Sequence, residues 1–289
     1  MDAGERIEQA LAQAVARTEA ENAPPKLAGA IRHGVFPGGA RVRPRLTLAV
    51  ARACGEDRPE MTDAAAAAIE LLHCASLVHD DLPCFDDADT RRGLPSVHAA
   101  YGVPVALLAG DALIVLAFET LARSAVEAPD RLGALIGTVA RAVGAPFGIA
   151  AGQAWESEPN PPAQQYRCSK TGALFVAATM AGAISAGQDP GPWRRLGHHL
   201  GEAYQVADDL LDAVATAEQH GKPVGRDAAL GRPNAVAELG LNGAVERLER
   251  LIEDAMDAVP KSRGEEELRE LVRLQALRLA PKRLLRSAA

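Results

Sequence analysis

Residues 64–93 read AAAAAIELLHCASLVHDDLPCFDDADTRRG, and the organisation of the chain follows from them. Their first half is apolar on nearly all sides, which predicts a central helix that is capped by Thr62 and runs to about Val78. Their second half places five aspartates within ten positions and ends on Arg91 and Arg92. Like charges at this density destabilise an apolar neighbourhood unless a cation compensates them.

This acidic stretch has two interpretations. Carboxylate oxygens are the ligands that Mg²⁺ prefers, and arginines bind anions directly, so the stretch predicts a combined metal and phosphate site. The alternative is a solvated acidic turn closed by arginine. A second acidic group favours the metal site: in YQVADDLLD, residues 204–212, Asp208 and Asp212 share one helix face. They lie about 6 Å apart along the axis, and Asp209 lies about 100° around from Asp208.

The composition predicts an all-α protein with one domain. Of the 289 residues, 48% are hydrophobic and only 3% are aromatic, so the core must be built from Ala, Leu, Val and Ile. Abundant Ala and Leu, with few alternating β-branched runs, favour helices. The chain has no repeat of fixed period, no low-complexity tract and no long linker. We therefore expect residues 1–289 to form a single domain.

Charge and cysteine usage exclude several classes of partner. The net charge is −7 and there is no long Lys/Arg run, which argues against nucleic acid. The four cysteines are scattered without a CxxC pair and indicate reduced thiols inside a cell. Residues 1–18 are charged and amphipathic rather than a signal peptide, and Asp111 and Glu119 interrupt the most apolar stretch, 103–122. We expect a cytoplasmic protein with no membrane span.

Two further segments combine helices with cationic residues. A glycine loop at 38–39 precedes Arg41, Arg43 and Arg45, which is typical of an anion site at a helix start or of an exposed basic turn. The apolar segment 162–187 predicts one helix that carries the polar triplet Ser169-Lys170-Thr171. If the two acidic groups face each other across a helical cavity, bridging Mg²⁺ ions could clamp a diphosphate between them. The remaining charge could then be neutralised by Arg91, Lys170 and Lys222.

Six segments, taken in this order, resemble the trans-isoprenyl diphosphate synthases, also called polyprenyl synthetases. They are GGARVRP, ELLHCASLVHDDLPCFDDADTRRG, GQAWE, KTG, YQVADDLLD and GKPVGRD. The resemblance covers about residues 25–285, and the paired aspartate motifs make it specific. It implies a single-domain bundle of antiparallel helices around a deep central cavity, usually as a homodimer.

The resemblance also implies roles for individual residues. The Mg²⁺ ligands would be Asp80, Asp81, Asp86, Asp208, Asp209 and Asp212. Contacts to the allylic diphosphate would come from Arg91, Lys170, Thr171, Gln205 and Lys222, with Arg91, Lys170 and Gln205 as the candidate catalytic residues. Isopentenyl diphosphate would contact Arg43, His73 and Arg92. Ala40 stands where the family usually has a lysine, so we expect Arg41 or Arg45 to compensate.

The implied reaction joins isopentenyl diphosphate head-to-tail to dimethylallyl, geranyl or farnesyl diphosphate. Metals and cations stabilise the diphosphate that leaves when the allylic C–O bond ionises. A cavity lined by Ala and Leu shields the carbocation from water. The double bond of isopentenyl diphosphate attacks the cation, and a proton then leaves. No side-chain nucleophile is needed, and none is evident.

Small residues below the first aspartate motif predict the product length. In one continuous helix, Ala75 and Ser76 lie about 6 to 7.5 Å below Asp80. A bulky aromatic at this level stops products at farnesyl length in the family, and this chain has none there. Leu71 and Leu72, about 12 Å down, could stop growth one isoprene unit later. We expect mainly geranylgeranyl diphosphate.

Other functions remain as alternatives. The nearest is a farnesyl diphosphate synthase. A terpene cyclase shares the fold, but its second motif carries Asn, Ser and Glu ligands rather than DDLLD. His79-Asp80 suggests an HD-type phosphohydrolase, although further His ligands at suitable spacing are not evident. A non-catalytic partner subunit usually loses one aspartate motif, and this chain keeps both.

Single residues also have plain structural interpretations. His73 could be a satisfied polar group on a buried helix, Lys170 could extend from a helix end to solvent, and Gln205 could make a packing hydrogen bond.

Overall fold

The computed structural model describes residues 1–36, 38–124, 126, 128–214 and 234–279, with the side chains beyond residue 274 and that of residue 214 left out. Regular structure in these ranges is helical except for one hairpin of two-residue strands. Strands β1 (Thr90–Arg91) and β2 (Leu94–Pro95) pair antiparallel, with Thr90 opposite Pro95 and Arg91 opposite Leu94. The expected all-α class is confirmed.

The longer helices are α1 (Ala3–Ala16), α2 (Pro25–Val35), α3 (Val42–Ala53), α4 (Pro59–Asp80), α6 (Val103–Ser124), α7 (Pro129–Val143), α10 (Ala173–Ser185), α11 (Arg194–Val214), α14 (Ala235–Asp257) and α15 (Glu265–Leu279). The short helices are α5 (Val97–Tyr101), α8 (Ile149–Ala154) and α9 (Ala163–Arg167). Three short 3₁₀ segments, Arg17–Glu19, Trp155–Ser157 and Gly191–Trp193, and one π segment, Cys168–Gly172, complete the set among the described residues.

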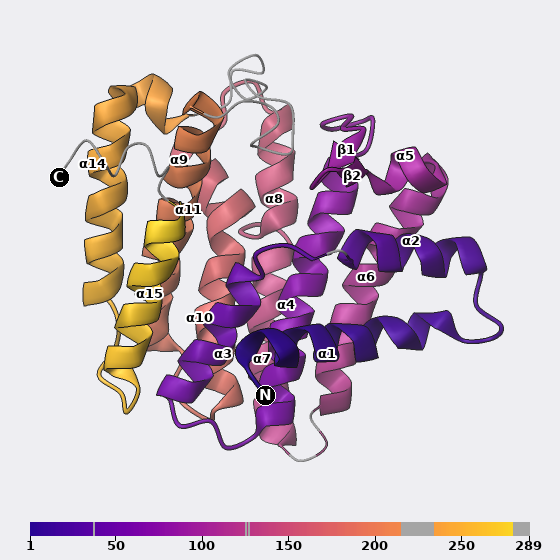
Figure 1. The fold of residues 1–289 in the computed structure, drawn as a ribbon, viewed down its shortest axis with the longest axis horizontal. Coiled ribbons are helices and arrows are strands. Elements are labelled where there is room, and N and C mark those ends of the chain that lie inside the picture. The colour runs from indigo at the N-terminus through magenta and orange to yellow at the C-terminus, as the bar shows by residue number, and fades with distance from the viewer. Residues whose placement is uncertain (37, 125, 127, 215–233, 280–289) are drawn as a thin grey trace.

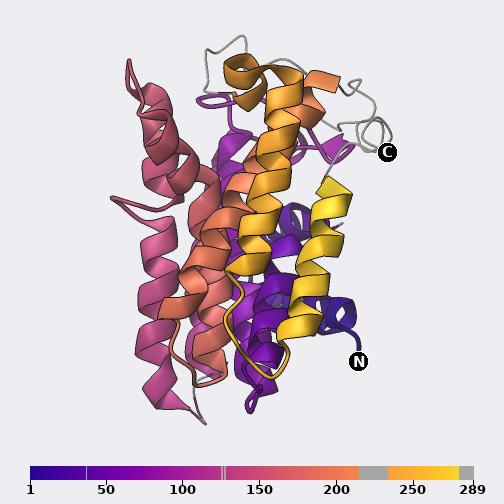
Figure 2. The same ribbon diagram turned by 90° about the vertical axis from the view of Figure 1, so that its left-hand side faces the viewer.

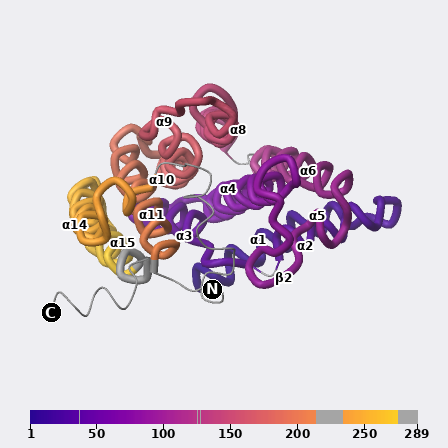
Figure 3. Tube along the Cα trace, turned by 90° about the horizontal axis from the view of Figure 1, so that it is seen from above, coloured from indigo at the N-terminus to yellow at the C-terminus, as the bar shows by residue number. Residues whose placement is uncertain are grey.

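Helix α4 is the centre of the bundle. It packs against α3, α6 and α10, and its residues are buried on nearly all sides. Figure 1 shows α3, α4, α6, α10 and α11 running alongside one another, with α1 and α2 lying across them. The view from above places α8 and α9 on one side of α4 and α14 and α15 at one end (Figure 3). An all-round apolar sequence therefore marks the core helix, as expected.

The ends of α4 differ from the prediction. The helix begins at Pro59 rather than at Thr62, because proline fits the first helical position, where its missing N–H is not needed. Thr62 is buried, and its hydroxyl donates to the carbonyl of Arg58 at 3.3 Å. The other end extends to Asp80, with Asp81 as the C-cap residue. Both aspartates therefore stand at the carboxyl end of the central helix.

The segment 162–187 is not one helix. Helix α9 leads into the π segment Cys168–Gly172, which leads into α10. A π turn inserts an extra residue into the helix and redirects the side chains it carries. The segment 234–259 forms α14, which kinks at Gly240 (φ 71°), and α15 follows after a turn. Helix α14 packs along α11, so the second aspartate motif has a neighbour on its outer side (Figure 2).

Helices α4 and α6 are both long and apolar enough, by length and composition alone, to cross a membrane. In α4, 78% of the apolar window is buried inside the fold, and the core position of this helix accounts for its apolar character. In α6 the buried share is 44%, because Val103, Leu107, Leu108 and Val115 lie on an exposed face. We call these four residues the α6 face.

Candidate active site

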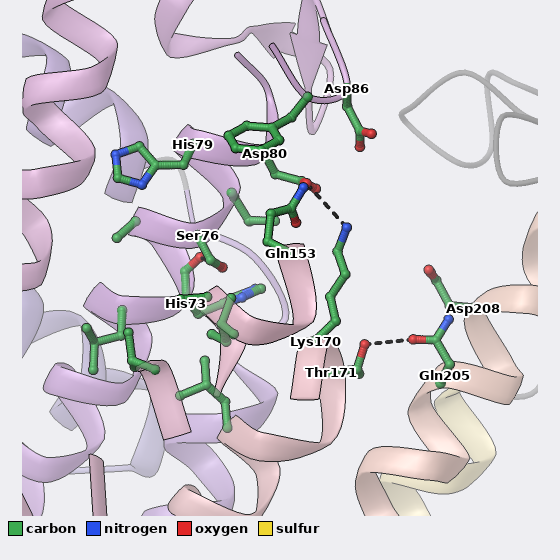
Figure 4. A pocket seen from close by; sticks show the side chains of 18 of the residues that line it. His73, Ser76, His79, Asp80, Asp86, Gln153, Lys170, Thr171, Gln205 and Asp208 are labelled. Atoms are coloured by element: carbon green, nitrogen blue, oxygen red, sulfur yellow. Dashed lines mark hydrogen bonds and ion pairs between the residues drawn. The ribbon is translucent and has the colours of Figure 1, made fainter. Parts of the chain in front are cut away.

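A cavity of about 960 Å³ lies between the carboxyl end of α4, the π segment, α8 and α11. Both aspartate motifs contribute to its wall, together with most of the cationic residues that the sequence singles out. Figure 4 shows Asp80 and Asp86 on one side and Asp208 on the other, with Lys170 between them. The two acidic groups therefore face the same space, as the sequence predicts.

The first motif folds back on the end of α4. The amide of Asp86 donates to the carbonyl of Asp80 at 2.9 Å, which closes the turn and brings the two carboxylates together. Asp87 takes a positive φ of 45° within this turn. Oxygen atoms of Asp80, Asp86 and Glu156 all lie within 4.8 Å of one another. Three carboxylate oxygens at this spacing form a hard, anionic donor set of the kind that Mg²⁺ binds.

Among the described residues, Lys170 is a cation that contacts this group directly. Its Nζ lies 3.3 Å from Asp80 Oδ1 and also donates to Glu156 Oε1. Burial raises the pKa of Asp80 from its usual value, Lys170 opposes that shift, and Asp86 and Glu156 add to it. The raised pKa of Asp80 thus follows from its burial and from the two neighbouring carboxylates.

The π segment explains how Lys170 and Thr171 reach the cavity together. Helix α8 packs directly against it: a Cβ at Gly152 would lie 2.5 Å from the Cα of Lys170. Only glycine allows this approach of the two backbones. Thr171 Oγ1 donates to Gln205 Oε1 at 2.7 Å, so the same segment also contacts α11.

The second motif splits into two faces of α11. Asp208 and Asp212 line the cavity, as their i,i+4 spacing predicts. Asp209 points the other way, is 2% exposed, and accepts a 2.7 Å hydrogen bond from the amide of Ala235 at the start of α14. Its other oxygen accepts from Gln205 Nε2 at 3.0 Å. Asp209 thus ties α14 and Gln205 to α11.

Asp81 is the counterpart of Asp209 in the first motif. It is 2% exposed and forms an ion pair with Arg91, whose Nε lies 3.0 Å from Asp81 Oδ1. Burial raises the pKa of Asp81 and Arg91 lowers it. Neither Asp81 nor Asp209 lines the cavity, so the geometry differs from the expectation of six direct metal ligands. The reason is that adjacent residues on a helix point in different directions.

The predicted contacts to the second substrate gather on one part of the wall. Arg43, His73 and Arg92 all line the cavity. Arg43 is 7% exposed and stacks over the rings of Phe175 and Tyr204, at 4.5 and 5.5 Å from their centroids. Burial, followed by the charges of Arg43 and Arg92, holds the pKa of His73 well below 6.5. His73 is therefore a neutral hydrogen-bonding group at pH 7.

The expectation that Arg41 or Arg45 compensates for Ala40 is wrong. Arg41 is 4% exposed, and its guanidinium donates to Glu8 at 2.8 Å and to Glu70 at 2.7 Å, away from the cavity. Arg45 lies over Gly4 at the start of α1. Arg41 ties the start of α3 to α1 and α4, and buried Glu70 requires such a partner. Lys222 lies outside the described residues.

The apolar end of the cavity contains the predicted chain-length residues. Leu72, Ala75 and Ser76 line it, with Ile114 of α6 and Leu174 of α10. The hydroxyl of Ser76 donates to the carbonyl of its own helix at His73 (2.8 Å), so it does not make this end polar. Leu71 is fully buried and lies outside the wall, which leaves Leu72 as the member of the leucine pair that faces the cavity.

Sequence reasoning missed Glu156 and the residues that hold it. Tyr166 Oη donates to Glu156 Oε1 at 2.7 Å, and Gln153 Nε2 donates to Glu156 Oε2 at 3.0 Å. The GQAWE segment contains two of these three residues, but nothing in their spacing reveals the contact with the first aspartate motif. Tyr204 was also missed as a cavity residue.

The family model, two relatives and one solved structure that match this chain all indicate the same kind of enzyme. The family model described as polyprenyl synthetase matches residues 24–274. The chain is 54% identical to the geranylgeranyl diphosphate synthase of Cereibacter sphaeroides and 51% identical to that of Rhodobacter capsulatus, each over 96% of both chains. The fold is similar to the crystal structure of a geranyltransferase from Helicobacter pylori complexed with magnesium and isoprenyl diphosphate. That likeness has a TM-score of 0.80 and 27% identity, over 94% of this chain and 96% of the other.

Proposed function

The chain belongs to the polyprenyl synthetase family, and on that premise we propose that it is a Mg²⁺-dependent prenyltransferase that makes mainly geranylgeranyl diphosphate. It condenses isopentenyl diphosphate with dimethylallyl, geranyl and farnesyl diphosphates. The observation that carries this proposal is the convergence of Asp80, Asp86, Asp208 and Asp212 on one cavity with an apolar end.

The allylic diphosphate binds at the acidic end of the cavity. Mg²⁺ held by Asp80 and Asp86 on one side, and by Asp208 and Asp212 on the other, would supply electrostatic stabilisation to the leaving diphosphate. Lys170, Thr171 and Gln205 contact the same diphosphate from the wall between them, and Arg91 lies within reach while it pairs with Asp81. Lys222, which we also assign to this diphosphate, lies outside the described residues.

Isopentenyl diphosphate binds beside it, at Arg43, His73 and Arg92. Two guanidinium groups supply the charge that a second diphosphate needs. His73 contributes one hydrogen bond to isopentenyl diphosphate. Because it is neutral, it does not form ion pairs with the metal-binding carboxylates. Because Arg41 and Arg45 point elsewhere, Arg43 and Arg92 carry this site without the lysine that Ala40 replaces.

The chain's own residues then control the carbocation. The side chains of Ala75, Ile114 and Leu174 are apolar, so they offer water no hydrogen-bond partner at the end of the cavity that holds the growing tail. The double bond of isopentenyl diphosphate attacks the allylic cation and forms the new C–C bond. The proton that leaves passes to the departing diphosphate, so no side-chain base is required.

The product length follows from the wall below Asp80. Ala75 and Ser76 leave room for a tail to pass, and Leu72 lies further down the same helix face. The two relatives that are more than half identical to this chain are both named geranylgeranyl diphosphate synthases. A farnesyl diphosphate synthase is the alternative within the family, and it would need a bulky residue at the level of Ala75.

The α6 face suggests the assembly. Leu107, Leu108 and Val115 are 47%, 54% and 67% exposed on one side of α6. Asp111, 58% exposed, lies on the same side, so the patch is mostly rather than wholly apolar, and exposed apolar side chains that cluster in this way favour a contact surface. We propose that a second copy of the chain covers it and that the enzyme is a cytoplasmic homodimer with no membrane span.

The test is an assay of the purified protein with labelled isopentenyl diphosphate and each allylic primer in turn. Label should move into prenyl diphosphates with Mg²⁺ present and should not do so after chelation with EDTA. A non-catalytic partner subunit would show no transfer with any primer.

A further inference from the structure

The ammonium of Lys170 lies among the carboxylates that form the predicted metal site. Oxygens of Asp80, Asp86 and Glu156 lie within 4.8 Å of one another, and Lys170 Nζ contacts two of these three residues. The charge of the lysine thus compensates two of the same carboxylates that suit a divalent cation. Figure 4 shows the side chain extended from the π segment toward Asp80.

The position of Lys170 is determined by the fold around it. Its backbone packs against Gly152, where a Cβ would lie 2.5 Å from the Cα of Lys170. Glu156 is oriented in turn, because Tyr166 donates to one of its oxygens at 2.7 Å and Gln153 to the other at 3.0 Å. The lysine side chain is 20% exposed and that of Glu156 is 13% exposed, so water screens the pair only in part.

A divalent cation and this ammonium compete for the same charge. Like charges a few ångströms apart repel strongly in a site that is only partly solvated. A metal that takes an oxygen from both Asp80 and Glu156 would lie next to Lys170 Nζ. The ammonium must therefore leave Asp80 before the metal binds fully there.

We propose that Lys170 is a built-in competitor for the divalent metal, positioned by Glu156. Without metal, its ammonium compensates the charge of the acidic group formed by Asp80, Asp86 and Glu156. When metal binds, the ammonium leaves Asp80, and Glu156 keeps it within reach of a bound diphosphate. The diphosphate part rests on the proposed function, whereas the competition does not. Metal binding to the protein alone is consequently weakened, and an anionic substrate that attracts Lys170 removes that penalty.

The experiment is a titration of the full-length protein with Mn²⁺ alone. Electron paramagnetic resonance measures the concentration of free Mn²⁺ at each step and so gives the dissociation constant. Lys170→Met keeps the length of the side chain and removes its charge, and we expect about tenfold tighter Mn²⁺ binding. Lys170→Arg keeps the charge and should bind Mn²⁺ within about twofold of the parent protein.

The matched control is Arg92→Gln, which removes a positive charge from the same cavity wall. Arg92 donates to the carbonyl of Gly38 instead of the acidic group, so this variant should change Mn²⁺ affinity by less than about threefold. Equal tightening in Arg92→Gln and Lys170→Met would overturn the proposal, because net charge alone would then explain the effect. Unchanged or weaker Mn²⁺ binding in Lys170→Met would overturn it as well.

Thermal unfolding gives a second readout. Without its lysine, the acidic group depends on the metal, so Mg²⁺ should raise Tm more in Lys170→Met than in the parent. An equal rise in both proteins would contradict the competition. Lys170→Gln is the second variant should Lys170→Met not fold, and the same results are expected of it. Condensation by the parent protein, measured separately, shows whether a negative result falls on this inference or on the proposed function.

Discussion

Thr171 Oγ1 donates a 2.7 Å hydrogen bond to Gln205 Oε1, and this bond joins the π segment that carries Lys170 to the helix of the second aspartate motif. Gln205 in turn donates to Asp209, which accepts the first amide of α14. A continuous chain of hydrogen bonds therefore runs from Thr171 in the cavity wall to the start of α14. Neutral side chains thus help to hold the second aspartate motif against the π segment and α14.

Breaking that link should slow catalysis more than it destabilises the protein. Thr171→Val keeps the shape of the side chain but removes the donor, so Gln205 keeps only its hydrogen bond to Asp209. We expect kcat/KM for the allylic substrate to fall about tenfold, the equivalent of one hydrogen bond near a charge. Thr171→Ser keeps the hydroxyl and should retain most of the activity. A Thr171→Val enzyme as active as Thr171→Ser would show that the bond is dispensable.

The two aspartates of the second motif should respond differently to the same change. Asp208→Asn removes charge from the cavity wall and should lower kcat at least about a hundredfold with little change in unfolding. Asp209→Asn disturbs a buried acceptor of two hydrogen bonds and should lower the free energy of unfolding by about 1 to 3 kcal/mol. Steady-state kinetics and urea unfolding of both variants separate the roles. Equal kinetic losses without destabilisation of Asp209→Asn would mean that both bind metal directly.

A bulky side chain at Ala75 should shorten the product. Ala75→Phe places a ring across the cavity below Asp80, and the main product should change from the geranylgeranyl to the farnesyl chain length. Chromatography of the dephosphorylated products measures this change. Ser76→Ala adds no bulk at the neighbouring position and should leave the product unchanged. If Ala75→Phe still makes the longer product, the tail does not pass this residue.

His73 should make the protein less stable in mild acid. Its pKa in the folded chain is lowered well below 6.5, by burial first and then by nearby arginines. Below about pH 6.5 the unfolded chain therefore binds a proton that the folded chain does not, and stability falls with pH.

Removing this group tests the sign of the effect. The stability of the parent protein should decrease, relative to His73→Gln, by about 1 kcal/mol between about pH 7.5 and about pH 5.5. Urea unfolding at the two pH values measures the difference. A parent protein that gains stability in acid relative to the variant would mean that His73 is protonated in the folded state.

Charge placed on the α6 face should separate the subunits. Leu108→Glu should convert a dimer of about twice 30.2 kDa into a monomer, measured by light scattering after size exclusion. Leu274→Glu is the control, because Leu274 is similarly exposed (47%) but lies on α15. Dissociation by both variants, or by neither, would place the subunit contact elsewhere.

The sequence is sufficient to predict a structural feature where a single helix contains the whole residue pattern. The apolar surface of α4 predicts its central position, and i,i+4 spacing predicts that Asp208 and Asp212 share a face. Motif order was sufficient to suggest the family. These features depend on helix geometry and on linear order, which the chain contains in full.

The features that sequence reasoning missed depend on contacts between distant elements. The π segment interrupts a pattern that predicts a single helix, and it lies where α8 packs against the chain at Gly152. Arg41 and Arg43 stand two positions apart, yet Arg41 turns to Glu70 in the core and Arg43 turns to the cavity. Glu156 joins the first aspartate motif across more than sixty residues. The roles of these residues depend on side-chain direction and on partners far away in the sequence. The local spacing of residues determines neither.

Two acidic groups that face one cavity with an apolar end make this protein a geranylgeranyl diphosphate synthase. The most direct test incubates the purified protein with dimethylallyl diphosphate, isopentenyl diphosphate and Mg²⁺, then separates the dephosphorylated products by chain length. Geranylgeraniol should be the main product, and no product should form when EDTA replaces Mg²⁺. Farnesol as the main end product, or no prenyl alcohol at all, would contradict it.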